Sequence, residues 1–180
     1  MLQSKSELSV VLSSTKSGPF TVLKVKLRIC FNMRLSRLDF YMGVAKLAAQ
    51  RSPCKSRQIG AVVVLDKRII GVGYNGPPSG FPHCRVCKRQ NSGENLDECF
   101  AIHAEVNAIT EALKAVGRAS LTSATLYCTV QPCIDCLKLI VRCEIVNIVY
   151  MHPYKCSKTR AKIVEEMKIN EVPYPNTPRL

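Results

Sequence analysis

A histidine and a glutamate two positions apart, followed much later by a Pro-Cys-x-x-Cys run, constrain this chain more than any other feature. The residues are His103, Glu105, Pro132, Cys133 and Cys136. One imidazole and two thiolates form a zinc-ligand set that leaves a fourth tetrahedral position open, as catalytic zinc sites require. The pattern therefore predicts a catalytic zinc held by His103, Cys133 and Cys136. Glu105 is expected beside the metal as a proton carrier and not as a ligand.

The spacing of apolar residues indicates how these side chains could meet. Residues 101–115 have the periodicity of a helix, which places His103 near its N-terminus and Glu105 shortly after, toward the same cavity. Pro132 is expected to open another helix, with Cys133 and Cys136 three positions apart on one of its faces.

Each half of the pattern also has an ordinary interpretation. A His-x-Glu pair is common on an exposed helix face, and Cys-x-x-Cys occurs as a redox pair in cytosolic proteins. The order of the two halves, the proline before the first cysteine and the strand-loop-helix setting of both favour the metal site.

Further stretches extend these motifs. Residues 103–109 read His-Ala-Glu-Val-Asn-Ala-Ile, residues 56–62 read Ser-Arg-Gln-Ile-Gly-Ala-Val, and residues 73–80 read Gly-Tyr-Asn-Gly-Pro-Pro-Ser-Gly. Over residues 38–172 the chain resembles the deoxycytidylate deaminases, including the late-competence deaminase-like branch of bacteria and phages. The first motif indicates only a cytidine-deaminase fold, whereas the Gly-Tyr-Asn-Gly stretch narrows the resemblance to the deoxycytidylate branch.

The resemblance implies a zinc-dependent hydrolysis of dCMP to dUMP and ammonia that supplies thymidylate synthesis. Zinc would activate a water for attack on the ring carbon that bears the amine, while Glu105 moves protons to the ring nitrogen and the leaving ammonia. The alternative is a deaminase of another cytosine- or adenine-bearing substrate, such as tRNA or single-stranded DNA. A non-catalytic binding protein of the same fold is a third hypothesis, and the intact Glu105 argues against it.

The resemblance also implies substrate-binding residues. Asn75, in the Gly-Tyr-Asn-Gly stretch, is expected to contact the substrate, although Asn-Gly is also a strong turn signal. Tyr154 is expected near the nucleotide phosphate with Lys155 as a charged neighbour, although Tyr154 could instead pack in the protein.

Ten cysteines without a convincing secretory signal favour thiolate chemistry in a reducing compartment over a disulfide scaffold. The resemblance implies a second, structural zinc that would order the long segment over residues 77–100. His83 is a possible substitute ligand, and the alternative is that these thiols are reduced and unligated. The expected ligands are Cys54, Cys84, Cys87 and Cys99.

Strands alternate with helices along the chain, which predicts an α/β fold. The fold expected is a cytidine-deaminase-like three-layer α/β/α sandwich with a mixed central sheet. It forms one domain over residues 34–180. Strands are expected at 59–65, 69–73, 125–130 and 145–151, and helices at 35–50, 101–115, from Pro132 onward and at 158–168.

Residues 1–33 are expected to be an N-terminal extension that is poorly ordered or loosely docked. Their Ser- and Lys-rich character would suit a transit peptide, but Glu7 and the lack of arginine before Arg28 weaken that interpretation. A start codon assigned upstream of Met33 explains the segment equally well.

The net charge of +13 raises the question of nucleic-acid binding. The basic excess is spread through the N-terminal third and both chain ends, without the aromatic residues that stack unpaired bases. A positively charged entrance to the substrate pocket also suits a phosphate-bearing small substrate. We therefore expect a small-molecule nucleotide substrate and a homo-oligomer, and no nucleic-acid partner. No apolar run reaches the roughly 18 residues of a membrane span, and a cytoplasmic location is expected.

Overall fold

The computed structural model describes residues 34–87, 98–116 and 121–175. Contacts along the chain divide it into two compact units, Met1–Leu35 and Ser36–Leu180. Every helix and strand of the described residues belongs to the second unit. The N-terminal extension expected over residues 1–33 lies outside the described residues, so its state stays a prediction.

Five strands form one mixed sheet in the second unit. Their order across the sheet is β2-β1-β3-β4-β5. β1 pairs antiparallel with β2 and β3, whereas β3 with β4 and β4 with β5 pair parallel, which confirms the mixed central sheet. The strands are β1 (Gly60–Leu65), β2 (Arg68–Tyr74), β3 (Thr125–Val130), β4 (Asn147–His152) and β5 (Asn170–Pro173).

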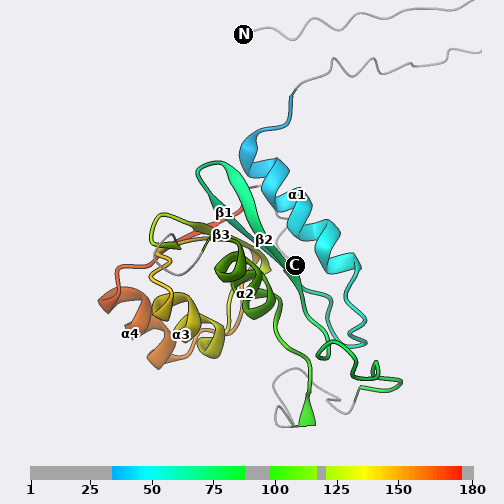
Figure 1. Cartoon of the computed structure of the whole chain (residues 1–180). Coiled ribbons are helices and arrows are strands. Elements are labelled where there is room, and N and C mark those ends of the chain that lie inside the picture. Colours follow the sequence, from blue (N-terminus) through cyan, green and yellow to red (C-terminus); the bar gives the residue numbers. More distant parts are fainter. Residues whose placement is uncertain (1–33, 88–97, 117–120, 176–180) are drawn as a thin grey trace, which may run out of the picture. The chain divides into compact units, whose positions relative to one another are not determined.

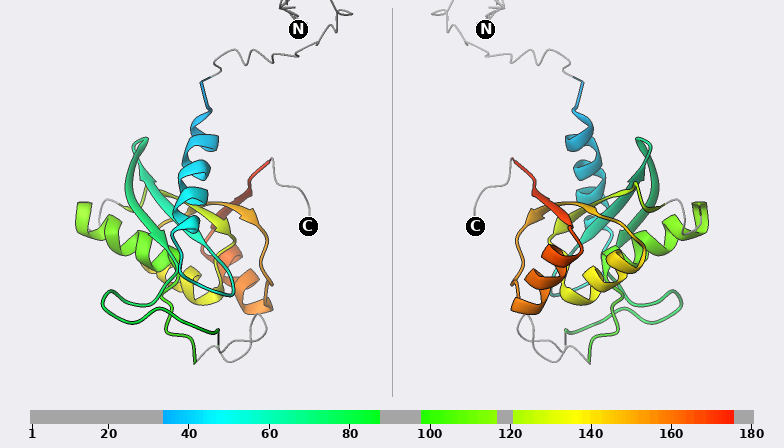
Figure 2. Two further views of the ribbon diagram at one scale, coloured as in Figure 1. Left: turned by 90° about the vertical axis from the view of Figure 1, so that its right-hand side faces the viewer. Right: turned by 90° about the vertical axis from the view of Figure 1, so that its left-hand side faces the viewer.

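The alternation of side chains along β1 separates two cores. Ala61 and Val63 pack in a cluster with residues of α2 and α3, whereas Val62 and Val64 pack with residues of α1. Figure 1 shows α1 on one face of the sheet and α2, α3 and α4 on the other, and Figure 2 gives the side views. The three-layer arrangement is confirmed. The helices are α1 (Arg37–Gln50), α2 (Ala104–Val116), α3 (Ile134–Arg142) and α4 (Lys158–Glu166).

The hairpin between β1 and β2 is tighter than the expected turn over residues 66–68. Leu65 pairs with Arg68, so only Asp66 and Lys67 form the turn, with φ values of 48° and 67°. Two consecutive left-handed residues make a type I′ turn, whose twist matches that of paired strands. Arg68 therefore belongs to β2.

The segment after α4 differs from the sequence prediction. The helix ends at Glu166, and the chain then adds β5, which the sequence did not predict. This strand has no alternating apolar pattern, because it is short and mostly exposed at the sheet edge. Backbone bonds hold the segment at both ends, from Asn170 N to Val146 O at 2.7 Å and from Tyr174 N to Tyr150 O at 2.7 Å. Within the described ranges, no helix combines the length and apolarity needed to cross a membrane.

Helix α2 lies unusually close to β2 because two glycines face it. A Cβ atom added to Gly71 would lie 2.2 Å from the Ala108 carbonyl oxygen, and one added to Gly73 would lie 2.2 Å from that of Ala104. Both obstacles are helix backbone, which cannot move aside as a flexible side chain can. Gly73 therefore sets how closely the first turn of α2 approaches the sheet.

We expect Gly73→Ala to destabilise the protein by about 1–3 kcal/mol or more, because overpacking must displace the start of α2. The midpoint of chemical denaturation measures the effect. Gly43→Ala is the matched control, since a Cβ at that exposed position in α1 meets nothing within 4 Å and alanine favours a helix by about 0.5–1 kcal/mol. Equal midpoints for Gly73→Ala and the wild type would contradict the close-packing argument.

Candidate active site

The start of α2 places His103 and Glu105. Ile102 pairs with Gly76 through two backbone hydrogen bonds of 2.8 and 3.1 Å, and His103 follows directly before the helix. Glu105 lies in the first turn with only 4% of its surface exposed. Asn107 Nδ2 donates to the Tyr74 carbonyl oxygen at 2.8 Å, which fixes this turn to the end of β2.

The start of α3 places the two cysteines. Cys133 is the N-cap residue, and its thiol makes no capping hydrogen bond. Cys136 lies in the first turn and is 1% exposed. The sequence predicted both cysteines within the helix, but the helix begins at Ile134 because Cys133 has an extended backbone. Its thiol lies within 4.8 Å of the donor atoms of His103 and Cys136.

The three donors meet at distances that suit zinc. His103 Nδ1 lies 3.2 Å from Cys136 Sγ and 3.5 Å from Cys133 Sγ. Zinc binds sulfur at about 2.3 Å and imidazole nitrogen at about 2.0–2.1 Å, so a tetrahedral site separates such ligand atoms by roughly 3.5 Å. The donor set and its spacing therefore fit a zinc ion, with one coordination position left for a fourth group.

The protonation of these groups also favours a cation. The hydrogen bond from Cys136 lowers the pKa of the Cys133 thiol to about 4, with His103 adding to the effect. The pKa of Cys136 is raised, because it donates to Cys133 and is buried. The hydrogen bond to Cys133 raises the pKa of His103. The opposite shifts mean that only one of the two cysteines readily becomes a thiolate without a metal. A bound metal ion favours the thiolate form of both, because it attracts both negative charges.

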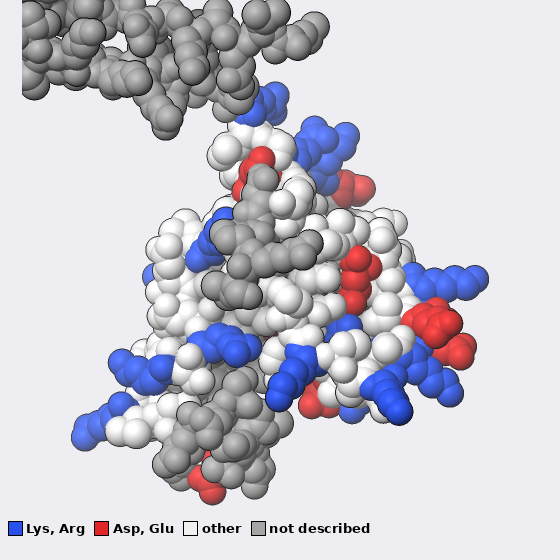
Figure 3. Space-filling view, turned by 180° about the vertical axis from the view of Figure 1, so that it is seen from behind, with Lys and Arg blue, Asp and Glu red and all other residues white. Residues whose placement is uncertain are grey.

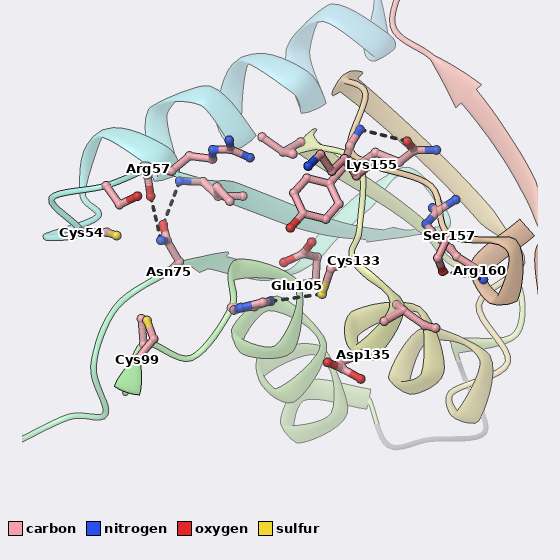
Figure 4. A pocket seen from close by; sticks show the side chains of 18 residues that line it. Cys54, Arg57, Asn75, Cys99, Glu105, Cys133, Asp135, Lys155, Ser157 and Arg160 are labelled. Atoms are coloured by element: carbon pink, nitrogen blue, oxygen red, sulfur yellow. Dashed lines mark hydrogen bonds between the residues drawn. The ribbon is translucent and has the colours of Figure 1, made fainter. Parts of the chain in front are cut away.

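Glu105 lies beside this cluster without joining it. Burial raises the pKa of its carboxyl group, so the proton is held more tightly than on an exposed glutamate. Figure 4 shows its side chain entering the pocket from α2 near Cys133. A carboxyl group in such a position can accept and return protons near the metal.

The pocket around the cluster has a volume of about 240 Å³. The sequence-predicted residues Asn75, Tyr154 and Lys155 all contribute to its wall, and Glu105 and His103 lie in the same cavity. The structure thus brings together the metal donors, the carboxylate and the predicted substrate-binding residues.

Asn75 serves the architecture of the pocket as well. Its Oδ1 accepts from Ser52 Oγ and from Ile59 N, each at 2.8 Å, and its Nδ2 donates to Arg57 O at 2.8 Å. The side chain is 6% exposed. It therefore holds the loop before β1 in place, and both roles considered from the sequence remain compatible with its position.

Tyr154 lies in the loop after β4. Its ring lies 5.9 Å from the guanidinium carbon of Arg57, within the range of a cation–π interaction. Its backbone N donates to Gln131 Oε1 at 3.1 Å. This loop brings Lys155 to the same wall, so Lys155 joins Arg57 and Arg160 among the cationic residues of the pocket.

The second cysteine set is not assembled in the same way. In the described part of the chain, His103, Cys133 and Cys136 form the one group of at least three His, Cys, Asp or Glu donors within 4.8 Å of one another. Cys54 and Cys99 line the active-site pocket (Figure 4). The second zinc site stays a prediction, and its expected ligands are Cys54, Cys84, Cys87 and Cys99.

Sequence reasoning did not single out several residues of the pocket wall, among them Arg57, Gln131 and Arg160. Gln131 carries a signal, because it directly precedes the Pro-Cys-x-x-Cys run. Arg57 lies within a stretch that carries the family resemblance but was not singled out. Arg160 carries no signal, since it is one of 26 lysines and arginines and only the fold shows that it is buried.

The family model of the cytidine and deoxycytidylate deaminase zinc-binding region matches residues 35–152. This chain belongs to that family. The match includes all three metal donors and Glu105, and zinc is therefore the cofactor of the site.

Individual relatives agree with the family model. The deoxycytidylate deaminase of Mycobacterium phage D29 is 41% identical over 121 residues, which cover 62% of this chain and 91% of that protein. That of Saccharomyces cerevisiae is 36% identical over 155 residues, covering 82% of this chain but only 48% of the yeast protein.

A solved structure supports the fold. The dCMP deaminase of cyanophage S-TIM5, in complex with dCMP and dUMP, superposes with a TM-score of 0.62 at 29% sequence identity. The superposition covers 75% of this chain and 94% of the phage chain. The cytidine-deaminase-like type of the α/β fold is confirmed.

Proposed function

We propose that this chain hydrolyses dCMP to dUMP and ammonia and so supplies dUMP for thymidylate synthesis. The observation that carries the proposal is the buried Glu105 carboxylate beside the cluster of His103, Cys133 and Cys136, at a pocket that Glu105, His103 and Cys133 line. Its relatives in phage D29 and yeast bear the name deoxycytidylate deaminase, and the S-TIM5 enzyme holds dCMP and dUMP.

The residues of the chain divide the chemistry between them. His103, Cys133 and Cys136 hold the zinc, which when bound supplies a Lewis acid that makes water nucleophilic at neutral pH. Glu105 takes a proton from the attacking water, gives one to the ring nitrogen and finally protonates the leaving ammonia. Because Glu105 is buried, little of its surface is exposed to bulk water.

Charge at the pocket wall supports a nucleotide over a nucleoside. Arg57 and Lys155 both line the cavity, on the loop before β1 and the loop after β4. A guanidinium and an ammonium together suit a phosphate group. The Tyr154 ring, 5.9 Å from the Arg57 guanidinium carbon, adds an aromatic surface beside that charge.

The second candidate, a deaminase of polynucleotides, needs an extended basic surface. On the face seen in Figure 3, the lysine and arginine side chains lie in separate groups with acidic and uncharged surface among them. The described residues of that face therefore do not form the continuous cationic track that the phosphates of a strand call for.

Ammonia release from dCMP, deoxycytidine, dCTP and a cytosine-containing oligonucleotide tests the proposal. We expect turnover of dCMP with a kcat/KM at least about tenfold above that of deoxycytidine, because the phosphate adds charge-assisted contacts of about 1.5–3 kcal/mol. Turnover of the oligonucleotide alone would favour the second candidate and overturn the first.

We further propose the second zinc, held by Cys54, Cys84, Cys87 and Cys99. We expect metal analysis of the purified protein to find two zinc ions per chain, and Cys87→Ser to lower the content to about one. The segment after Gly76 should then lose order near Asn75, and activity should fall with it. One zinc per chain in both proteins would mean that these cysteines are unligated.

We also propose that the protein forms a homo-oligomer and that it is located in the cytoplasm. Phe40 and Leu47 on α1 are 49% and 63% exposed, which suits burial against another copy. Unpaired cysteines stay reduced in the cytosol, which suits a chain that uses thiolates as metal ligands. Light scattering of the purified protein measures the assembly, and imaging of a tagged chain gives its location.

A further inference from the structure

A buried ion pair lies at the edge of the pocket, where its arginine, Arg160, forms part of the wall. Arg160 of α4 and Glu171 of β5 form a bidentate pair, with side chains only 3% and 11% exposed. A buried ion pair contributes little net stability, since desolvation of both charges offsets their attraction. The hydrogen bonds that Arg160 and Glu171 make to other residues therefore matter more than the attraction between the two side chains.

One hydrogen bond leads to the metal site. Arg160 Nε donates to the Pro132 carbonyl oxygen at 3.0 Å. That carbonyl belongs to the peptide bond that joins Pro132 to Cys133. The bond therefore restrains the backbone from which the Cys133 side chain projects toward the other metal donors.

The other branch leads to the substrate wall. Glu171 Oε2 accepts from Gln131 Nε2 at 3.0 Å, and Gln131 Oε1 accepts from Tyr154 N at 3.1 Å. The backbone N of Gln131 also donates to the His152 carbonyl oxygen at 2.8 Å. Gln131 therefore ties the loop that carries Tyr154 to the carboxylate of Glu171.

We propose that Arg160 and Glu171 are positioning residues with two separable effects, one on zinc retention through Pro132 and one on substrate affinity through Gln131 and Tyr154. The substrate effect rests on the proposed function, whereas the zinc effect does not. Neither effect requires the ion pair to touch the substrate.

Two conservative variants separate the branches. Arg160→Lys keeps a charge for Glu171 but loses the planar donor to Pro132. We expect it to lose zinc to a chelator about 10- to 100-fold more readily than the wild type.

Gln131→Met keeps the side-chain length but removes the oxygen that accepts the hydrogen bond from Tyr154 N. We expect wild-type zinc retention and a KM for dCMP raised about tenfold or more, with a smaller change in kcat.

Glu171→Gln tests the residue that joins the two branches, since its carboxylate accepts hydrogen bonds from both Arg160 and Gln131. We expect it to change both zinc retention and KM, since its amide cannot serve both branches as the carboxylate does. Combined with Gln131→Met, its effect on KM should not add, because both act through one backbone group. Additive effects would show that Glu171 and Gln131 act on KM by separate routes, which would overturn the shared substrate branch. Glu111→Gln, in an exposed pair on α2, is the matched control and should change neither quantity.

The outcomes are distinguishable. Thermal melting first establishes that each variant is folded. If Glu171→Gln does not fold, Arg160→Lys still tests the zinc effect and Gln131→Met still tests the substrate effect. Wild-type zinc retention in folded Arg160→Lys overturns the first effect, and an unchanged KM in Gln131→Met overturns the second. If the wild type binds zinc but does not turn over dCMP, the proposed function and the substrate effect fail together, while chelation still decides the zinc effect.

Discussion

Replacing Glu105 with glutamine is expected to lower kcat by about 10²- to 10⁴-fold while the zinc content stays at the wild-type level. The amide has nearly the shape of the carboxyl group but cannot accept or return a proton. Steady-state ammonia release measures the first effect, and metal analysis of the same preparation measures the second.

The control for this variant lies on the same helix. Glu111→Gln makes the same chemical change at an exposed position of α2, where the carboxylate pairs with Lys114 at 2.8 Å. We expect its activity to stay within about twofold of the wild type, because exposed pairs contribute only 0–1 kcal/mol or so. Loss of zinc from Glu105→Gln would show instead that Glu105 is a ligand.

Removing any one metal donor is expected to abolish zinc binding and activity together. His103→Ala, Cys133→Ala and Cys136→Ala each leave two of three protein ligands, too few for a stable catalytic site. Activity should fall to the background of the assay, and added zinc should not restore it. Metal content and turnover measured on the same samples check the prediction.

Cys143→Ala is the matched control for the cysteine variants. Cys143 ends α3 and is 3% exposed, so it shares the helix and the burial of Cys136 without belonging to the donor cluster. We expect it to keep its catalytic zinc. A fully active variant at any of the three donor positions would remove that residue from the ligand set.

The sequence by itself identified the chemistry, because metal binding requires particular side chains at particular spacings. His103, Glu105, Cys133 and Cys136 could be read in this way. The structure brings the three metal donors together, and His103, Glu105 and Cys133 line one pocket. The α/β fold was also predictable, since strands with buried residues on both faces, such as β1, alternate with helices of clear periodicity.

Tertiary structure decided what depends on pairing between distant segments. β5 has no sequence pattern of its own, because its place comes from backbone bonds to β4 and not from a buried face. Its position in turn brings Glu171 to Arg160 and Gln131. No local rule separates these side chains from ordinary surface charges.

The same contrast holds for the close approach of α2 to β2. The sequence shows Gly73 only as part of a motif, whereas the fold shows that any side chain there would strike the Ala104 carbonyl beside Glu105. Residue types thus determined which groups do the chemistry. The packing of strands and helices determined how those groups are held, because packing depends on neighbours that the local sequence does not contain.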